Sequence, residues 1–488
     1  MGVIIVLLCL AGVIFIYFYN NPMKHGRWFM IRRFINWFPL GMTYAFLYMG
    51  RYNLNVSKNA LGSLMSKEDF GVIFAAGTIT YALSFLVNGP LVDKFGGKAG
   101  IIISAVGSAV ANILLGILTY LVLMGKLQMN MVVAYSILYS LNMYFQSFGG
   151  VSIIKVKAYW FHVRERGVFG AIFGTLISFG VYFAFDWGQA IVNMLKTNST
   201  VPVTWFSNFL KSIFALETKA VDPIWAVFFI PAVIMIFWAI MDWIFIKDTP
   251  EEANFPPFDT ADASSGHMHE RDFTALELLK RVFTSPLMLT FAFIELTTGV
   301  VRNGIYQWYI IFAYEVKQPG GEFFLDNFGL LLCVFGIIGG FLGGLISDNF
   351  FQSRRSPPIV FFNGFIFIMV LLMAVFLTSS PVIVGSAAVL ISMAVIGAHS
   401  LMSGTAAADF GGRKATATSS GIVDGFVYLG SGIQSFSLGF LTTWDWHWWP
   451  IFLMPFTLLG MYLAIRIWHE LPEATKKYIV EVEHKKVV

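Results

Sequence analysis

Residues 38–60 read FPLGMTYAFLYMGRYNLNVSKNA, and this stretch decides how the rest of the chain is interpreted. It is apolar enough to cross a lipid bilayer, yet Arg51 lies well inside it. A cation in the hydrocarbon core costs about 2.5–3.5 kcal/mol on insertion scales, so it persists where it faces water, a partner or a ligand. The apolar run at residues 287–314 contains a second such cation, Arg302. We expect the two arginines to face each other across a cavity and to hold an anion.

The composition points to a protein that spans a membrane many times. The chain has 488 residues, of which 57% are hydrophobic and 12% are charged, and long uncharged apolar runs recur along it. This predicts an all-α polytopic membrane protein rather than a large soluble domain. The net charge of +4 does not indicate a nucleic-acid partner, because the basic residues lie between apolar runs rather than on one patch.

Two six-span halves account for most of the chain. The apolar runs lie near residues 34–57, 69–92, 99–124, 129–154, 167–195 and 222–246, and then near 286–314, 326–347, 357–378, 381–407, 416–441 and 448–468. We expect an N-terminal bundle at 34–246, a central loop at 247–285, a C-terminal bundle at 286–470 and a tail at 471–488. Residues 1–33 are interpreted as one extra helix and a basic linker, with a cleaved or disordered leader as the alternative.

The basic residues predict the orientation. Lys94, Lys98, residues 155–166, residues 247–281 and residues 354–355 all fall in loops on one side. By the positive-inside rule, the central loop and the C-terminus are expected in the cytoplasm of a cell-membrane protein. The basic cluster after the first apolar run places the N-terminus outside.

The two halves repeat each other. Arg302 follows Arg51 by 251 residues, and Asp348 follows Asp93 by 255 residues. Similar spacings indicate one six-helix unit used twice, which is the usual plan of transporters whose site lies between two rocking halves.

Residues 89–98, GPLVDKFGGK, join the second and third core spans. Glycines let helices approach closely, and the acidic and basic side chains can clamp one end of the bundle in one state. The sequence resembles the signature of the major facilitator superfamily, and a degraded copy occurs at residues 344–355. The resemblance implies a gate made by Gly89, Asp93, Lys94, Gly96, Lys98, Asp348, Arg354 and Arg355.

Further motifs resemble the organophosphate:phosphate antiporter family, over roughly residues 40–470. They are residues 145–149 (FQSFG), then Lys155, Trp160 and residues 165–167 (ERG), then residues 302–308 (RNGIYQW), residues 414–421 (KATATSSG) and residues 248–250 (DTP). In that family the arginines that match Arg51 and Arg302 bind the phosphate. The guanidinium group suits this role, because it presents a planar fork of donors to a tetrahedral oxyanion.

The chain also departs from the family pattern. The family's site usually carries a lysine on the second helix and a histidine on the fifth, where ungapped counting places Phe85 and Ile177 here. A family acid expected near Cys333 is also absent. Glu295, His399 and Asp424 instead lie inside apolar runs. We interpret them as an ion pair, a proton site or helix–helix hydrogen-bonding residues. We expect that Asp424 pairs with Arg302 in the empty state.

Other polar residues in the spans are candidates for the cavity wall, with core hydrogen bonding as the alternative. They are Tyr48, Tyr52, Asn55, Gln146, Tyr306 and Gln307. The chain contains no glycine-rich phosphate loop, nucleophile elbow or zinc-binding helix, so we expect no enzyme, no cofactor and no metal.

The leading hypothesis is a monomeric carrier in the lipid bilayer that exchanges a small organic phosphate for inorganic phosphate. One alternative is a proton-coupled carrier of another organic anion. A second alternative is a membrane receptor for sugar phosphates.

Overall fold

The computed structural model describes residues 2–162, 165–196, 204–214, 221–257, 260, 275–351, 354–410 and 416–470. The predicted tail at 471–488 and residues 258–259 and 261–274 of the central loop therefore lie outside the described residues. Within the described ranges the protein is helical, as predicted.

The first half contains α2 to α9, and the second half contains α10 to α17. In the first half the helices are α2 (Arg27–Leu61), α3 (Lys67–Phe95), α4 (Gly97–Leu123), α5 (Met131–Trp160), α6 (Arg166–Tyr182), a π-helix (Phe183–Trp187), α7 (Gly188–Leu195), α8 (Trp205–Phe214) and α9 (Ala226–Phe245). In the second half they are α10 (Ala275–Thr284), α11 (Pro286–Val316), α12 (Glu322–Asp326), α13 (Phe328–Phe350), α14 (Ser356–Phe376), α15 (Pro381–Phe410), α16 (Thr416–Trp444) and α17 (Trp448–Arg466).

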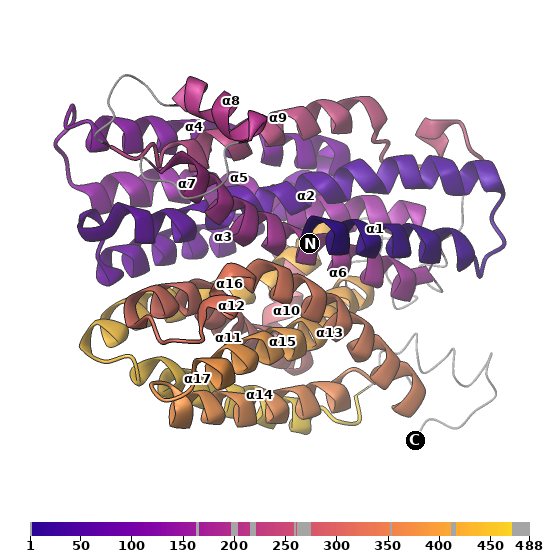
Figure 1. Cartoon of the computed structure of the whole chain (residues 1–488). Helices are drawn as coiled ribbons and strands as arrows, with labels where there is room; N and C mark the ends of the chain where they lie inside the picture. The colour runs from indigo at the N-terminus through magenta and orange to yellow at the C-terminus, as the bar shows by residue number, and fades with distance from the viewer. Residues whose placement is uncertain are drawn as a thin grey trace.

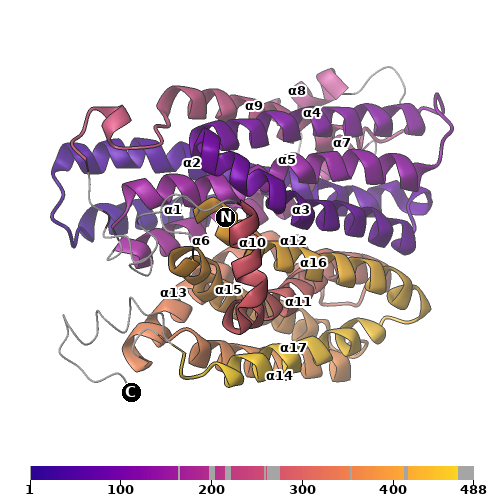
Figure 2. The same cartoon turned by 180° about the vertical axis from the view of Figure 1, so that it is seen from behind.

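The halves form two layers, which are seen from opposite sides in Figures 1 and 2. Helices α3 and α16 make the most extensive contact between the layers, and α6 packs against α13. A Cβ atom on Gly71 would lie 2.6 Å from the backbone oxygen of Ser435, and one on Gly89 would lie 2.8 Å from Cα of Thr418. Glycine is therefore required where the backbones of α3 and α16 meet.

Short-range signals set several helix ends. The Ser66 side chain and the Asp69 side chain cap each other's backbone N–H groups at the start of α3. Ser285 caps α11, whose first residue is Pro286. Helix α2 begins seven residues before its predicted span because Arg33 and Asn36 are buried and hydrogen-bonded.

Nine described helical segments are long and apolar enough to cross a membrane. Helices α2, α5, α11 and α16 are not among these nine. These four more polar helices carry Arg51, Gln146, Arg302 and Asp424. The helices with the weakest hydrophobic signal therefore hold the polar centre of the molecule.

The extra N-terminal helix, α1 (Gly2–Tyr19), packs against α6 on the outside of the bundle. The Tyr17 hydroxyl donates to the backbone oxygen of Met30 at 2.8 Å, and Arg33 Nε donates to the Tyr17 hydroxyl at 3.0 Å. Arg33 also forms a buried ion pair with Glu165 at 2.9 Å. The C-terminal end of α1 is thus fixed to the first half.

Candidate functional site

Arg51 on α2 is buried and hydrogen-bonded to three neighbouring side chains. Its Nε donates to Gln146 Oε1 at 2.9 Å, its Nη1 to the Tyr428 hydroxyl at 2.6 Å and its Nη2 to the Tyr81 hydroxyl at 3.3 Å. The Tyr48 ring centre lies 4.6 Å from the guanidinium carbon, within cation–π range. Arg51 therefore contacts both halves, because Tyr428 belongs to α16.

The partners of Arg51 are themselves held in place. Gln146 donates to Asn142 Oδ1 at 3.2 Å, and Asn142 Nδ2 donates to the backbone oxygen of Gly50 at 3.0 Å. Asn112 Nδ2 also donates to Asn142 Oδ1 at 3.0 Å. This buried network fixes the orientation of Gln146 and, through it, of Arg51.

Arg302 on α11 differs sharply from Arg51. It is 5% exposed, and among the described residues it has no hydrogen-bond or ion-pair partner. Its guanidinium carbon lies 5.9 Å from the Tyr428 ring centre, while that of Arg51 lies 5.4 Å from the same centre. The two cations thus lie near one ring, and within the described ranges Arg51 is hydrogen-bonded whereas Arg302 is not.

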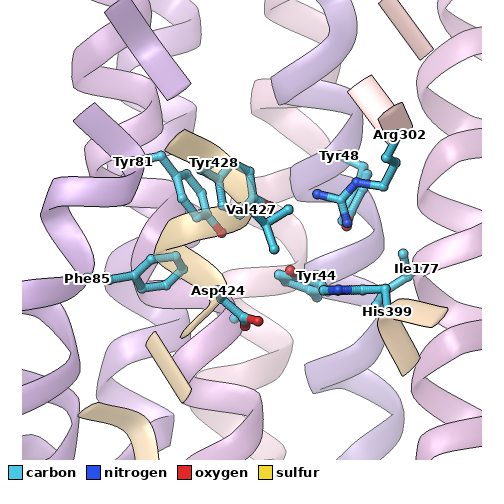
Figure 3. Close-up of a pocket in the computed structure, with 11 residues that line it drawn as sticks. Tyr44, Tyr48, Tyr81, Phe85, Ile177, Arg302, His399, Asp424, Val427 and Tyr428 are labelled. Carbon is cyan, nitrogen blue, oxygen red and sulfur yellow. The ribbon is translucent and has the colours of Figure 1, made fainter. Parts of the chain in front are cut away.

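A small cavity of about 30 Å³ lies beside Arg302 (Figure 3). A phosphate ester needs more room than this, so the cavity walls must move apart to admit one. Its walls are mainly aromatic and include one arginine, one histidine and one carboxylate. The lining residues are Tyr44, Tyr48, Tyr81, Phe85, Gly150, Ile177, Arg302, His399, Asp424, Val427 and Tyr428.

The expectation that both arginines face each other across a cavity needs correction. Arg302 lines the cavity, whereas Arg51 is not part of its wall. The rings of Tyr48, Tyr81 and Tyr428 line it and pack on Arg51. Phe85 and Ile177, the positions of the missing family cations, do line the cavity.

Three ionisable residues adjoin Arg302. Glu295 is fully buried, and its Oε2 lies 2.9 Å from His399 Nδ1, while its Oε1 has no partner in the described structure. Asp424 lines the cavity without contacting Arg302 in an ion pair, so the pairing expected from the sequence is wrong for this state. The Oδ1 atom of Asp424 is buried without a hydrogen-bond partner within the described ranges.

The remaining predicted cavity residues lie elsewhere in the polar centre. Tyr52 donates to Asn303 Oδ1 at 2.9 Å, and Tyr306 bonds to Ser392 at 3.0 Å. Gln307 Oε1 accepts from Gln434 and Ser435, both at 2.7 Å. Asn55 is buried, and neither polar side-chain atom has a partner among the described residues. These four residues do not line the described cavity.

At one end of the bundle, called the Asp93 end below, Asp93 of the predicted gating motif contacts both halves. Asp93 Oδ1 lies 2.9 Å from Lys155 Nζ. Asp93 Oδ2 accepts from the Thr418 backbone N–H at 3.0 Å and from its hydroxyl at 2.7 Å. These bonds join α3 and α5 of the first half to the start of α16 in the second.

The other predicted gate residues have local roles. The Lys98 backbone N–H donates to Asp248 at 2.8 Å, Gly96 has a φ of +92° beside that carboxylate, and Lys94 is exposed. Arg354 is buried and donates to the Phe351 backbone, and Arg355 donates to Ser347 at 3.1 Å. The side chain of Asp348 lies outside what the structure describes.

The opposite end, called the Glu315 end, is closed by contacts that sequence reasoning missed. Lys67 Nζ lies 2.9 Å from Glu315 Oε2 and donates to the Thr442 backbone. Asp186 in the π-helix accepts from the backbone N–H groups of Gly329 at 2.8 Å and Leu330 at 3.0 Å. Contacts between the two halves therefore occur at both ends, with the central cavity between them.

Two six-helix bundles that meet around a buried polar cavity are typical of membrane transporters. The chain belongs to the Major Facilitator Superfamily, whose family model matches residues 40–435. This match confirms the family and the fold predicted from the sequence. The superfamily consists of transporters rather than enzymes.

Three named relatives are similar to most of this chain. The chain is 25% identical to a glycerol-3-phosphate transporter of Bacillus subtilis, over 83% of this chain and 85% of the relative. It is 22% identical to a probable hexose phosphate transport protein of Chlamydia trachomatis, over 93% and 94%. It is 23% identical to the membrane sensor protein UhpC of Escherichia coli, over 83% and 84%.

Solved structures share the fold. A bacterial homologue of the lysosomal transporter Spinster, inward-facing and unoccupied, matches with a TM-score of 0.65 at 13% identity, over 93% of this chain and 98% of that one. The fucose:proton symporter of E. coli matches with a TM-score of 0.56 at 16% identity, over 88% and 97%. At these identities the likeness shows the fold alone.

Proposed function

We propose that this protein exchanges a small organic phosphate, of the glycerol phosphate or sugar phosphate class, for inorganic phosphate by alternating access. The observation that carries this proposal is Arg302, a buried guanidinium in the cavity wall that has no hydrogen-bond partner among the described residues. A buried charge without a partner is costly, and an anion with several acceptor oxygens offsets that cost. The names of the relatives support phosphate as that anion.

Arg51 contributes a second positive charge close to the same site. Its three hydrogen-bond partners include two hydroxyls from the cavity wall, Tyr81 and Tyr428. A phosphate that enters the cavity can replace one of these hydroxyls as an acceptor. The substrate would then draw Arg51 of the first half and Arg302 of the second half toward each other.

Exchange follows from the charge of the empty site. Two buried cations repel each other, and an anion between them offsets both the repulsion and the desolvation cost. A loaded site therefore favours closure of the halves, and the empty site reorients slowly. We place the Asp93 end in the cytoplasm and the N-terminus outside, and we propose that one chain is the working unit.

The test is counterflow in proteoliposomes. Vesicles loaded with inorganic phosphate should take up labelled glycerol 3-phosphate or hexose 6-phosphate, and unloaded vesicles should not. Arg302→Lys should lower this uptake by about 100-fold, because an ammonium cannot reproduce the bidentate fork. Arg466→Lys, at an exposed position at the end of α17, is the matched control. Equal uptake with and without internal phosphate contradicts exchange.

A second candidate function is proton-coupled transport of another organic anion. The buried Glu295–His399 pair beside the cavity favours it, because such pairs hold protons on transport pathways. Uptake driven by an inward proton gradient without internal phosphate, and lost in Glu295→Gln, would identify this mode.

A receptor is the third candidate, since one relative is named a membrane sensor protein. Binding of a phosphate ester without flux would identify this function.

A further inference from the structure

We propose that Asp424 forms a second subsite of this cavity, which receives a hydrogen-bond-donating group, an ammonium or a hydroxyl, on the organic part of the phosphate ester. The proposal rests on the function proposed above, because it assumes that Arg302 receives the phosphate. It assigns a substrate class: phosphate esters with a donor group on a short carbon chain.

The first observation is that two opposite charges line one cavity without pairing. Arg302 and Asp424 both belong to its wall, and no ion pair joins them (Figure 3). The Nε atom of Arg302 and the Oδ1 atom of Asp424 are each buried without a hydrogen-bond partner in the part of the chain described here. A ligand with an acceptor at one end and a donor at the other satisfies both atoms.

The second observation is that no cation in the described part of the chain forms a direct ion pair with Asp424. The charged groups that face it are Glu295, His399 and Arg302. His399 is already bonded to Glu295. Phe85, at the place of the family's lysine, lines the same cavity and offers no donor. The carboxylate of Asp424 is therefore left for a ligand.

The third observation concerns how firmly Asp424 is placed. A Cβ atom on Gly425 would lie 3.2 Å from the backbone oxygen of Ala82, and one on Gly421 would lie 3.1 Å from the Phe85 ring. The two glycines on either side of Asp424 thus let α16 lie directly on α3. The carboxylate is held at one position along the cavity.

The aromatic walls favour the same class of ligand. Tyr44, Tyr81, Phe85 and Tyr428 surround the space beside Asp424. Aromatic faces attract an ammonium group, and tyrosine hydroxyls bond to substrate hydroxyls. The cavity is thus chemically bipolar, with a guanidinium for the phosphate and a carboxylate among aromatic rings for the donor group.

The experiment compares three phosphate esters of equal length: 2-aminoethyl, 2-hydroxyethyl and propyl phosphate. Each competes with labelled inorganic phosphate for phosphate–phosphate exchange in proteoliposomes. The wild-type protein should be inhibited by at least one donor-bearing ester at a concentration about tenfold or more below that of propyl phosphate. The ester that inhibits at the lower concentration identifies the donor as ammonium or hydroxyl.

Two variants locate the preference. Asp424→Asn should remove a preference for the ammonium ester and leave inhibition by propyl phosphate within about twofold. Asp424→Leu should remove a preference for either donor. Asp445→Asn makes the same chemical change at an exposed loop carboxylate and should change nothing.

Equal inhibition by all three esters in the wild-type protein would overturn the subsite. An equal loss of inhibition by all three esters in Asp424→Asn would also overturn the subsite. It would indicate that Asp424 is a proton carrier or a structural carboxylate. If the variants do not fold, the wild-type comparison alone decides the matter.

Thermal stabilisation in detergent separates the two proposals. Selective stabilisation by a donor-bearing ester without any phosphate exchange supports the subsite and contradicts the transport function. Phosphate exchange that does not discriminate among the esters supports the transport function and contradicts the subsite.

Discussion

Asp93 and Asp186 perform the same task at opposite ends of the molecule. Each carboxylate belongs to the first half and accepts backbone N–H groups from the first turn of a second-half helix. Asp93 binds the start of α16, and Asp186 binds the start of α13. Helix N-termini carry partial positive charge, so both contacts are charge-assisted. One such contact therefore joins the two halves at each end.

Removing one contact should open the end it holds. Asp186→Asn should shift the population toward a state open at the Glu315 end, and Asp93→Asn toward one open at the Asp93 end. A hydrogen bond to a charged group contributes about 1.5–3 kcal/mol, so each shift should be about tenfold or more. Distances between spin labels at Met129 and Phe323 report the Glu315 end, and labels at Lys94 and Phe350 report the Asp93 end.

Gly329→Ala is an independent test of the Asp186 contact. A Cβ atom at Gly329 would lie 2.5 Å from Asp186 Oδ1, so the carboxylate must move away. The same opening as in Asp186→Asn is expected. Opening at the Asp93 end by either variant would contradict the assignment.

The two arginines should differ in their effect on stability. Arg51→Lys removes a hydrogen-bonded fork and leaves buried acceptors unsatisfied, so it should destabilise the empty protein by about 1–3 kcal/mol. Arg302→Lys breaks no hydrogen bond of the described structure and should change stability by less than about 0.5 kcal/mol. Thermal unfolding in detergent measures both. Equal destabilisation would mean that Arg302 is also structural.

The contact between Arg33 and Glu165 predicts a pH dependence. Burial raises the pKa of Glu165, but hydrogen bonds from His25 and Arg33 outweigh it and lower the pKa to about 2. Because the pKa of an unfolded glutamate is about 4.3, this contribution is complete above that pH and is lost as the pH falls toward 2. We expect it to be about 2 kcal/mol after solvent screening.

Thermal unfolding at pH 7 and pH 3 tests this contribution. Glu165→Gln should lower the melting temperature at pH 7 and should lose less stability than the wild-type protein between pH 7 and pH 3. Glu470→Gln is an exposed control. An unchanged pH profile in Glu165→Gln would show that the contact adds no stability.

Phe85→Lys should convert the bipolar cavity to a more cationic one. The new ammonium would adjoin Asp424, since both positions line the same cavity, and would pair with it. We expect a loss of any preference for 2-aminoethyl phosphate in the competition assay. Phe283→Lys, at an exposed position on α10 outside the predicted spans and the cavity wall, is the control.

The sequence by itself determined the fold, because apolar runs, loop charges and a repeated signature all report local composition. It also singled out Arg51, Arg302, Asp93 and the three unusual ionisable residues, because polar groups stand out in apolar spans. A resemblance to a known family then indicated phosphate.

Only the tertiary structure decided which of these groups are free. Arg51 and Arg302 occupy equivalent places in the repeat, yet Arg51 is bonded to Gln146, Tyr81 and Tyr428, while Arg302 is bonded to none of the residues that the structure describes. Asp186 was missed because one acid near the end of an apolar run carries no motif, and its partners are backbone groups of a distant helix. Pairing depends on how helices far apart in the sequence meet, since Arg51 bonds to Tyr428 at a separation of 377 positions and Asp186 bonds to Gly329 at a separation of 143.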